Sequence, residues 1–346
     1  MDITTIGVDI AKNVFQIYGV DAKGNKVLSK RLRRDELLPY MAQLPCCLVG
    51  IEACGGAHYW ARAFTQLGHT VKLMSPRYVK PYVKTNKNDA NDAEGCCEAV
   101  TRPTMRFVPI KTIEQQDILV LHKVRSRLVA QSTELQNQMR GLLAEYGIVI
   151  AKGESHLRNG LAKLLDPDNN QLTARAKVLF TELQQELFDL LKRVEHCDTA
   201  LVEVVKANDS CKRLKTIPGI GDITSSALVA TIGDAKNFKK GRCFSAFLGL
   251  VPKQSSSGEK TRLLGISKRG NTYLRCLLVH GARSVIYQVM KQQKDDKRSR
   301  WLRQLVERVG QNKAIVALAN KNARTAWAIL AHETSYQINY QEASAS

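Results

Sequence analysis

Residues 84–94 read KTNKNDANDAE and place two carboxylates, Asp89 and Asp92, three residues apart. In a helix that begins near Asn88, these side chains lie on one face, one turn apart. Two neighbouring carboxylates repel each other unless a cation lies between them, and Mg²⁺ takes oxygen ligands of this kind. The alternative is a polar helix start, with Asn88 or Asp89 as the N-cap and the acids favoured by the helix dipole. The stretch alone leaves both interpretations open.

The segment before this stretch alternates between apolar strands and amphipathic helices, and two of its strands carry an acid. Asp9 interrupts a buried strand predicted over residues 3–10, the first of a three-strand meander. Glu52 follows another apolar strand, predicted over residues 47–51. A buried carboxylate is costly unless it binds a metal or a donor. Sites in α/β folds also gather at the carboxyl ends of strands.

The order Asp9, Glu52, Asp89, Asp92 resembles that of the RNase H-like, RuvC-type nuclease fold, where four acids hold two divalent ions. Two such ions can stabilise both the attacking and the leaving oxygen of a phosphoryl transfer. A sugar kinase or actin-like ATPase also opens with an acid on its first strand, but no matching Gly-rich phosphate loop follows in this sequence. We therefore predict an α/β, RNase H-like N-terminal domain with a four-carboxylate metal site.

The middle of the chain shows the heptad spacing of long helices. Leucines recur every seven residues from Leu121 to Leu142. A clearer pattern lies within residues 176–205, where apolar residues from Phe180 to Val204 recur at intervals of three and four residues. This pattern is typical of an α-helical coiled coil. Pairing within one chain and assembly of a dimer would both satisfy it, with residues 147–170 as the connecting tip.

Positive charge is concentrated in the C-terminal part of the chain. Of the 52 basic and 32 acidic residues, 24 and 8 respectively fall within residues 211–346. Such an excess is the electrostatic footprint of a polyanionic partner. A basic protein with no role in nucleic-acid binding would share it.

Residues 214–234 resemble a helix-hairpin-helix element, with Gly219 and Gly221 in its hairpin. The hairpin amides and the helix that follows can receive a phosphate oxygen; the alternative is a plain corner between helices. Two glycine-punctuated loops follow, over residues 247–259 and 265–271. The basic side chains that we expect to contact nucleic acid are Lys253, Lys260, Arg262, Lys268, Arg269 and Arg275.

The nine cysteines include no CxxC pair and no zinc spacing. This usage indicates a reducing compartment, and we predict a cytoplasmic protein. No window approaches the ~18 consecutive apolar residues of a membrane span, and the N-terminus lacks the features of a signal peptide.

Five motifs resemble those of one transposase family and occur in the same order. They are GVDIAK (7–12), IEACGGAHYW (51–60), NKNDANDAE (86–94), IPGIG (217–221) and GISKRGN (265–271). The family is insertion-sequence family 110, and the form EACGGAH indicates its subgroup 1111. The resemblance covers nearly the full chain.

This resemblance implies a division into domains. A RuvC-like domain would span residues 1–113, a coiled-coil domain 114–208 and a mostly α-helical transposase domain with the helix-hairpin-helix 209–335, followed by a tail over 336–346. The family's four-acid site falls on Asp9, Glu52, Asp89 and Asp92. Its serine, in a Ser-Gly-Glu context after Leu-Gly-Leu-x-Pro, falls on Ser257; three serines run together here, so Ser255 and Ser256 remain open.

The resemblance also implies the chemistry and the partners. A transposase of this kind cuts and rejoins DNA through a phosphoserine intermediate, with Mg²⁺ or Mn²⁺ at the carboxylates. The implied partners are double-stranded donor and target DNA, a noncoding guide RNA encoded by the element, and further copies of the chain in a dimer or tetramer with composite sites.

Two rival functions stay open on the sequence. In a metal-dependent, junction-resolving nuclease the carboxylates alone would hydrolyse DNA. A non-catalytic nucleic-acid-binding scaffold would rest on the basic C-terminal part and the hairpin. Four ordered carboxylates weigh against the scaffold, because they repel a polyanion.

Overall fold

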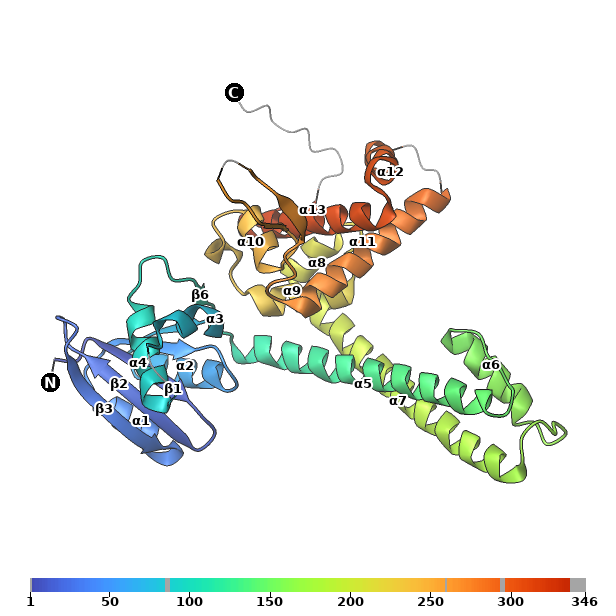
Figure 1. Ribbon diagram of the computed structural model, residues 1–346, viewed down its shortest axis with the longest axis horizontal. Coiled ribbons are helices and arrows are strands. Elements are labelled where there is room, and N and C mark those ends of the chain that lie inside the picture. The colour runs from blue at the N-terminus through green and yellow to red at the C-terminus, as the bar shows by residue number, and fades with distance from the viewer. Residues whose placement is uncertain (1, 85–87, 259, 293–295, 337–346) are drawn as a thin grey trace. The chain divides into compact units, whose positions relative to one another are not determined.

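The computed structural model divides the chain into two compact units, Met1–Thr112 and Ile113–Ser346. It describes residues 2–84, 88–258, 260–292 and 296–336. Residues 85–87 of the acidic stretch, Glu259 of the predicted Ser-Gly-Glu motif and residues 337–346 of the predicted tail lie outside this description. As predicted, the first unit is mixed α/β and the remainder is mostly helical (Figure 1).

A six-stranded sheet in the order β3-β2-β1-β4-β5-β6 forms the centre of the first unit. β1, β2 and β3 make the predicted antiparallel meander, β4 and β5 continue the sheet parallel to β1, and β6 pairs antiparallel with β5. The strands are Thr5–Ile10 (β1), Val14–Val20 (β2), Lys26–Arg33 (β3), Leu48–Glu52 (β4), Thr70–Met74 (β5) and Phe107–Val108 (β6).

Helices cover both faces of this sheet because its central strands are apolar on both. One face carries α1 (Arg34–Ala42) and α2 (Ala57–Gln66), whose Leu37 and Trp60 join a buried cluster with Ile6 and Phe15. The other face carries α4 (Asp89–Val100), reached through α3 (Pro76–Val79) and the short 3₁₀-helix η1 (Lys80–Tyr82).

Two glycines of the sheet allow α4 to lie directly on the strand backbone. A Cβ atom at Gly7 of β1 would come within 2.0 Å of the carbonyl oxygen of Ala93, and one at Gly50 of β4 within 2.7 Å of Cβ of Val100. Gly7 is opposite Gly50 in the β1–β4 register. Side chains alternate between the two faces of a strand, so Asp9 and Glu52, each two residues further on, lie on this same face as α4.

The second unit begins with two long helices that pack against each other within the chain. They are α5 (Ile113–Ala144) and α7 (Ala174–Ala207), and α6 (Glu154–Leu164) lies between them in sequence. Their shared core includes Leu135, Met139 and Phe180. As predicted, the segment over residues 147–170 connects the two long helices, and it also contains α6, which buries Leu157, Leu161 and Leu164 in this core.

The buried positions of α5 and α7 drift away from the predicted heptads near the ends of the helices. Leu142 is exposed and Leu143 is buried in its place. Val205 is buried, whereas Val204 is only half-buried. A straight helix has 3.6 residues per turn, so a strict seven-residue repeat rotates off the contact face by ~20° per heptad. This rotation accounts for the burial of Leu143 in place of Leu142 and of Val205 in place of Val204.

A helical domain follows, with α11 (Thr272–Gln292) and α13 (Gln311–His332) at its centre. The alanines at 314, 319, 323 and 326 are buried, and these small side chains let α13 approach its neighbours closely. Around this pair lie α8 (Asp209–Lys215), α9 (Asp222–Ile232), η2 (Ala235–Asn237), α10 (Gly241–Phe247) and α12 (Lys297–Val309). A two-stranded sheet, β7 (Pro252–Gln254) with β8 (Leu263–Ile266), completes the domain. Within the described ranges, every helix is too short or too polar to cross a bilayer.

Candidate functional site

The four predicted carboxylates of the first unit come together at one edge of its sheet. Asp9 lies near the end of β1 and Glu52 ends the neighbouring β4. Asp89 and Asp92 occupy the first turn of α4, the helix packed on the same face. The sequence folds this way because alternation puts both strand acids on the α4 side and the i, i+3 spacing puts both helix acids on one face.

The pKa of Asp9 reports the proximity of these groups. Burial raises the pKa of Asp9 from its ordinary 3.8 to about 6, and the negative charges of Asp92, Asp89 and Glu52 raise it further in that order of effect. A shift of this kind is typical of functional sites. The fold thus disfavours the ionised form of Asp9.

The start of α4 satisfies both interpretations of the acidic stretch. Asn88 is the N-cap, and its side-chain oxygen accepts a hydrogen bond of 2.8 Å from the backbone N–H of Asn91. Because Asn88 caps the helix, neither Asp89 nor Asp92 is needed as the N-cap. Both carboxylates therefore remain available for a cation.

The donor set suits a hard divalent cation, since all four side chains offer carboxylate oxygens. Within the part of the chain that the structure describes, however, no three Asp, Glu, His or Cys side chains converge closely enough to enclose an ion as they lie. The mutual repulsion that raises the pKa of Asp9 opposes such convergence while no positive charge lies between the acids. Asp9, Glu52, Asp89 and Asp92 are the residues that would hold the ion.

Two thiols that the sequence did not single out border this site. Burial raises the pKa of the Cys54 thiol, and the charges of Glu52 and Asp9 add to the effect. Burial also raises the pKa of Cys96, on α4, far above its ordinary value. Both thiols therefore stay protonated at neutral pH, and the oxygen character of the site is preserved. Cys54 follows Glu52 by two residues and Cys96 follows Asp92 by four on α4, but no pattern in the sequence showed that both thiols would lie beside the same site.

Ser257 lies in the second unit, between β7 and β8. It forms an isolated bridge with Lys260, and Gly258 between them adopts φ +57°, a value that favours glycine. The Ser256 hydroxyl is engaged locally, because it accepts hydrogen bonds from Gln254 Nε2 (3.0 Å) and from the backbone N–H of Arg262 (3.3 Å). Among the described residues, no side-chain hydrogen bond engages the exposed hydroxyls of Ser255 and Ser257, so the local contacts distinguish Ser256 from both of them.

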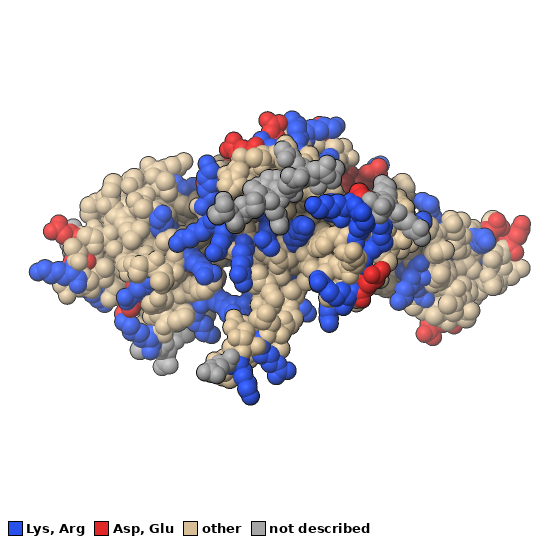
Figure 2. Space-filling model, turned by 90° about the horizontal axis from the view of Figure 1, so that it is seen from above, with Lys and Arg blue, Asp and Glu red and all other residues tan. Residues whose placement is uncertain are grey.

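Five of the six basic residues predicted to contact nucleic acid are exposed on or near the β7–β8 strand pair. They are Lys253, Lys260, Arg262, Lys268 and Arg269. Figure 2 shows Lys and Arg side chains gathered over the middle of the face it presents, with few Asp or Glu among them.

The prediction that Arg275 contacts nucleic acid was wrong, because this residue is buried. Its side chain is buried, and its guanidinium donates to the carbonyl oxygens of Leu248 (3.1 Å) and Arg269 (3.4 Å) and to the Thr272 hydroxyl (3.0 Å). Arg275 fastens the loop over residues 265–271 to α11 and is not available at the surface.

The predicted hairpin joins α8 to α9, and its two glycines differ in surroundings. Gly219 has φ +94° and packs against α11, where a Cβ at Gly281 would come within 1.8 Å of its carbonyl oxygen. Gly221 is exposed and is the N-cap of α9. Asp222, in the first turn of α9, pairs with Lys215 at 2.5 Å and so places a carboxylate where a phosphate was predicted. Phosphate binding by this hairpin stays a prediction, and Gly221 is the glycine exposed for it.

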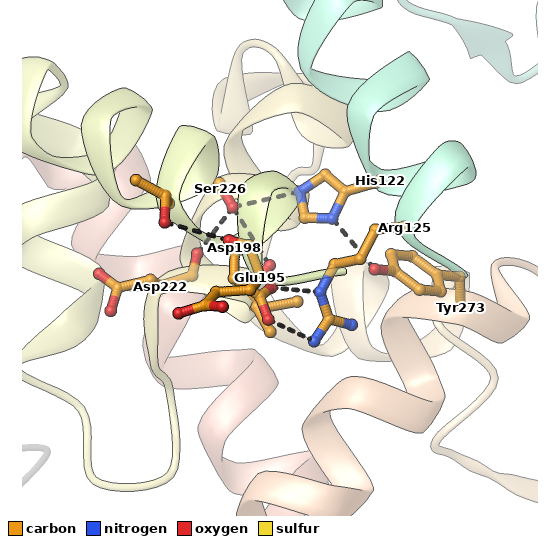
Figure 3. A network of polar contacts seen from close by, with 9 residues as sticks. His122, Arg125, Glu195, Asp198, Asp222, Ser226 and Tyr273 are labelled. Atoms are coloured by element: carbon orange, nitrogen blue, oxygen red, sulfur yellow. Dashed lines mark hydrogen bonds and ion pairs between the residues drawn. The ribbon is translucent and has the colours of Figure 1, made fainter. Parts of the chain in front are cut away.

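A buried polar network that the sequence did not reveal ties the long helices to the C-terminal helices (Figure 3). Nδ1 of His122 on α5 lies 3.0 Å from the Tyr273 hydroxyl of α11, and Nε2 lies 3.1 Å from the Ser226 hydroxyl of α9. Ser226 donates its own proton to the carbonyl of Asp222 at 2.7 Å, so Nε2 of His122 is the nitrogen that carries hydrogen. Nearby, Arg125 of α5 forms a two-pronged ion pair with Asp198 of α7.

His122 is neutral at ordinary pH. Burial lowers the pKa of His122 from 6.5 to about 4, and the positive charge of Arg125 lowers it further. The network therefore holds α5 and α7 against α9 and α11. It does not act as an acid or base near pH 7. His122 is a single histidine within an apolar helical pattern, so no sequence motif indicated this network.

Comparison with known proteins places this geometry in a family. A family model named for the DEDD transposase of IS110 and described as "Transposase" matches residues 6–148, and one described as "Transposase IS116/IS110/IS902 family" matches residues 211–298. The chain is 47% identical to the "Probable family 20 transposase" of Pseudomonas aeruginosa, over 97% of this chain and 99% of that protein. It is 46% identical to the "Transposase for insertion sequence element IS1111A" of Coxiella burnetii, over 97% and 92%. The transposase for IS1328 of Yersinia enterocolitica is 41% identical, over 97% and 99%.

These matches span nearly the whole chain and both of its units. They explain why a carboxylate cluster and a strongly basic helical domain occur in one protein, since a transposase must both act on DNA and hold it. The chain is a DNA transposase and belongs to the IS116/IS110/IS902 family.

Proposed function

We propose that this transposase cuts and rejoins DNA through a covalent phosphoserine at Ser257, assisted by Mg²⁺ or Mn²⁺ at Asp9, Glu52, Asp89 and Asp92. The observation that carries the proposal is that Asp92, Asp89 and Glu52 lie close enough to Asp9 for their charges to add to the rise in its pKa that burial causes. The sheet order, with a meander followed by parallel strands and with acids near the end of β1 and at the end of β4, supports an RNase H-like assignment for the first unit.

The covalent step conserves the energy of the phosphodiester. The hydroxyl of Ser257 gives up its proton as its oxygen attacks phosphorus, the bond from phosphorus to one deoxyribose oxygen breaks, and the departing oxygen takes up a proton. Rejoining reverses the exchange when a DNA hydroxyl displaces the serine oxygen, so no ATP is needed. A divalent cation at the carboxylates would supply charge stabilisation for the phosphoryl group. The exposed, locally unengaged hydroxyl of Ser257 supports its role in this step.

The exposed basic side chains on or near the β7–β8 strand pair support binding of a nucleic-acid backbone near Ser257. We extend the proposal to a noncoding RNA that selects donor and target by base pairing, which leaves the protein to recognise backbone and shape. The acids belong to one unit and Ser257 to the other. This division is compatible with sites completed between copies in a dimer or tetramer. The setting for such a reaction is the bacterial cytoplasm.

The test is an assay with supercoiled donor, target, Mg²⁺ and RNA from the element's flanks, analysed on a denaturing gel. Wild type and Ser256→Ala should form a DNA–protein adduct, whereas Ser257→Ala and Asp89→Ala should form none. Ser256→Ala is the matched control, because it removes a neighbouring hydroxyl of the same hairpin. An adduct that persists in Ser257→Ala would refute the mechanism.

A metal-dependent, junction-resolving nuclease is the second candidate, and the acid cluster favours it equally. It predicts free nicks in Ser257→Ala, no adduct in any sample, and loss of all cleavage in Asp89→Ala. The same gel therefore separates the two functions.

A further inference from the structure

A cavity of about 330 Å³ opens on the first unit, away from the four carboxylates in sequence and on different elements. It is lined by Tyr78, Pro81, Tyr82, Thr104, Met105 and Arg106. A volume of this size is at the lower end of those that hold small ligands. The lining is aromatic and apolar, with one guanidinium at its edge.

The two tyrosines point to the same side of the chain. Tyr78 lies in α3 and Tyr82 in η1, four residues later, so their side chains are one helical turn apart. Val79 between them is buried and anchors the segment in the core, which turns Tyr78 outward. Tyr78 is 41% exposed, so its ring is accessible to a ligand from solvent.

The surroundings of the cavity are strongly basic. Residues 76–84 and 101–106 contain five basic side chains and no acid: Arg77, Lys80, Lys84, Arg102 and Arg106. Glu98 pairs with two of them, with Lys84 at 2.9 Å and with Arg102 at 2.5 Å. Arg102 also lies over the ring of Tyr82, 5.7 Å from its centroid.

We propose that this cavity binds one unpaired base of a DNA strand, with the base stacked on Tyr78 and the flanking phosphates held by Arg77, Lys80 and Arg106. Aromatic rings within a basic surface are the combination that single-stranded nucleic acid requires, since every base has a face that stacks and every linkage carries a negative charge. A small neutral metabolite would gain nothing from the five cations. A fully paired duplex could reach them but could not fill the cavity.

The proposal takes DNA as the polymer because the chain is a transposase, and it is independent of the serine chemistry proposed above. Strand exchange leaves bases transiently unpaired beside the cut. The cavity lies toward the end of α4 that is opposite Asp89 and Asp92, since Thr104, Met105 and Arg106 follow that helix. At 1.5 Å per residue, the C-terminal end of α4 lies about 17 Å from Asp89 and about 12 Å from Asp92 along the helix axis, so the base would be held roughly that far from these acids.

The experiment uses the full chain carrying Ser257→Ala, without divalent ions, so that cleavage plays no part. The probe is a short DNA duplex with 2-aminopurine in a one-base bulge, and the comparison is the same duplex fully paired. Binding should quench the fluorescence of the bulged base by stacking. Adding Tyr78→Ala should weaken binding of the bulged duplex about tenfold, abolish the quenching and leave the paired duplex unaffected. Tyr78→Phe should restore both signals, since the ring is retained.

Tyr59→Ala is the matched control, because Tyr59 is a 49% exposed tyrosine of the same unit on α2. It should leave quenching and affinity unchanged. The proposal is overturned if Tyr78→Ala weakens the paired duplex equally, if Tyr59→Ala has the same effect, or if only an RNA version of the bulged probe responds to the substitution. Loss of the phosphoserine adduct in the earlier assay would not alter any of these results.

Discussion

Replacing Asp9 by Asn should stabilise the first unit at neutral pH when divalent ions are absent. The folded environment raises the pKa of Asp9 from 3.8 to about 6, so ionised Asp9 costs folding free energy. Two pKa units correspond to at most about 3 kcal/mol. Asp9 is only partly buried and water screens its charge, so we expect about 1–2 kcal/mol. The residue would then be kept for the reaction at the expense of stability.

The size of this stabilisation depends on pH in a definite way. Between about pH 4 and pH 6 the folded unit binds more protons than the unfolded chain, so the stability contributed by Asp9 falls as the pH rises through this window. Asp9→Asn removes that dependence. Its advantage should be complete at pH 7.5 and reduced to roughly a third at pH 4.5. Saturating Mg²⁺ should also diminish the advantage, because a bound cation stabilises the ionised acid in the wild type.

Amide hydrogen exchange of peptides from β1 and β4 measures this unit alone, which avoids assuming that both units unfold together. At pH 7.5 with EDTA, these amides should exchange roughly 5- to 30-fold more slowly in Asp9→Asn than in wild type. Asp2→Asn, an exposed acid outside the cluster, should change nothing. An Asp9→Asn protein that is no more protected than wild type at pH 7.5, or equally favoured at pH 4.5, would refute the electrostatic account of the site.

Three further predictions follow from contacts described above. Gly7→Ala should prevent α4 from seating on the sheet and abolish soluble expression, because its Cβ would lie 2.0 Å from the carbonyl oxygen of Ala93, whereas Gly55→Ala meets nothing within 4 Å and should express normally. His122→Ala should lower the melting temperature of the second unit and flatten the dependence of that temperature on pH. The pKa of His122 falls from 6.5 to about 4 on folding, so the wild-type unit loses stability as the pH drops through this range. A melting temperature that falls with pH in the variant as it does in the wild type would contradict the burial of a neutral His122. Lys253→Ala should weaken DNA binding and reduce its salt slope by about one, whereas Arg275→Ala should reduce thermal stability and leave the salt slope unchanged, as measured by titration at several salt concentrations.

The sequence predicted the sheet and its acids well because both rest on local patterns. Apolar runs interrupted by Asp9 and ended by Glu52 specify strands with a carboxylate near one end, and Asn88 signals the start of a helix. Neither pattern says that α4 would lie on Gly7 and Gly50, since that contact joins residues more than 80 positions apart for Gly7 and more than 40 for Gly50. Yet this packing is what brings Asp89 and Asp92 to Asp9.

Other features escaped prediction for different physical reasons. Basic residues were assigned to nucleic acid from charge alone, and charge does not distinguish the exposed Arg269 from the buried Arg275. The heptads were extended to Leu142, although the helix had by then rotated Leu143 into the core. The segment around Ser257 is too short and too polar for a strand pair to be predicted from its sequence. Gly258 adopts a φ of +57° in the turn there, a value that is readily accessible to glycine.

The α5–α7 pair can also be regarded as a lever. At 32 and 34 residues, these helices extend about 50 Å. Their base is clamped by the His122 network and the Arg125–Asp198 ion pair, while α6 packs at the far end. About 35 Å of each helix lies beyond the clamp, so a tilt of about 5° there would displace the far end by about 3 Å. A force applied to α6 by anything that grips it is therefore delivered, with mechanical advantage, to the helices that carry Ser226 and Tyr273.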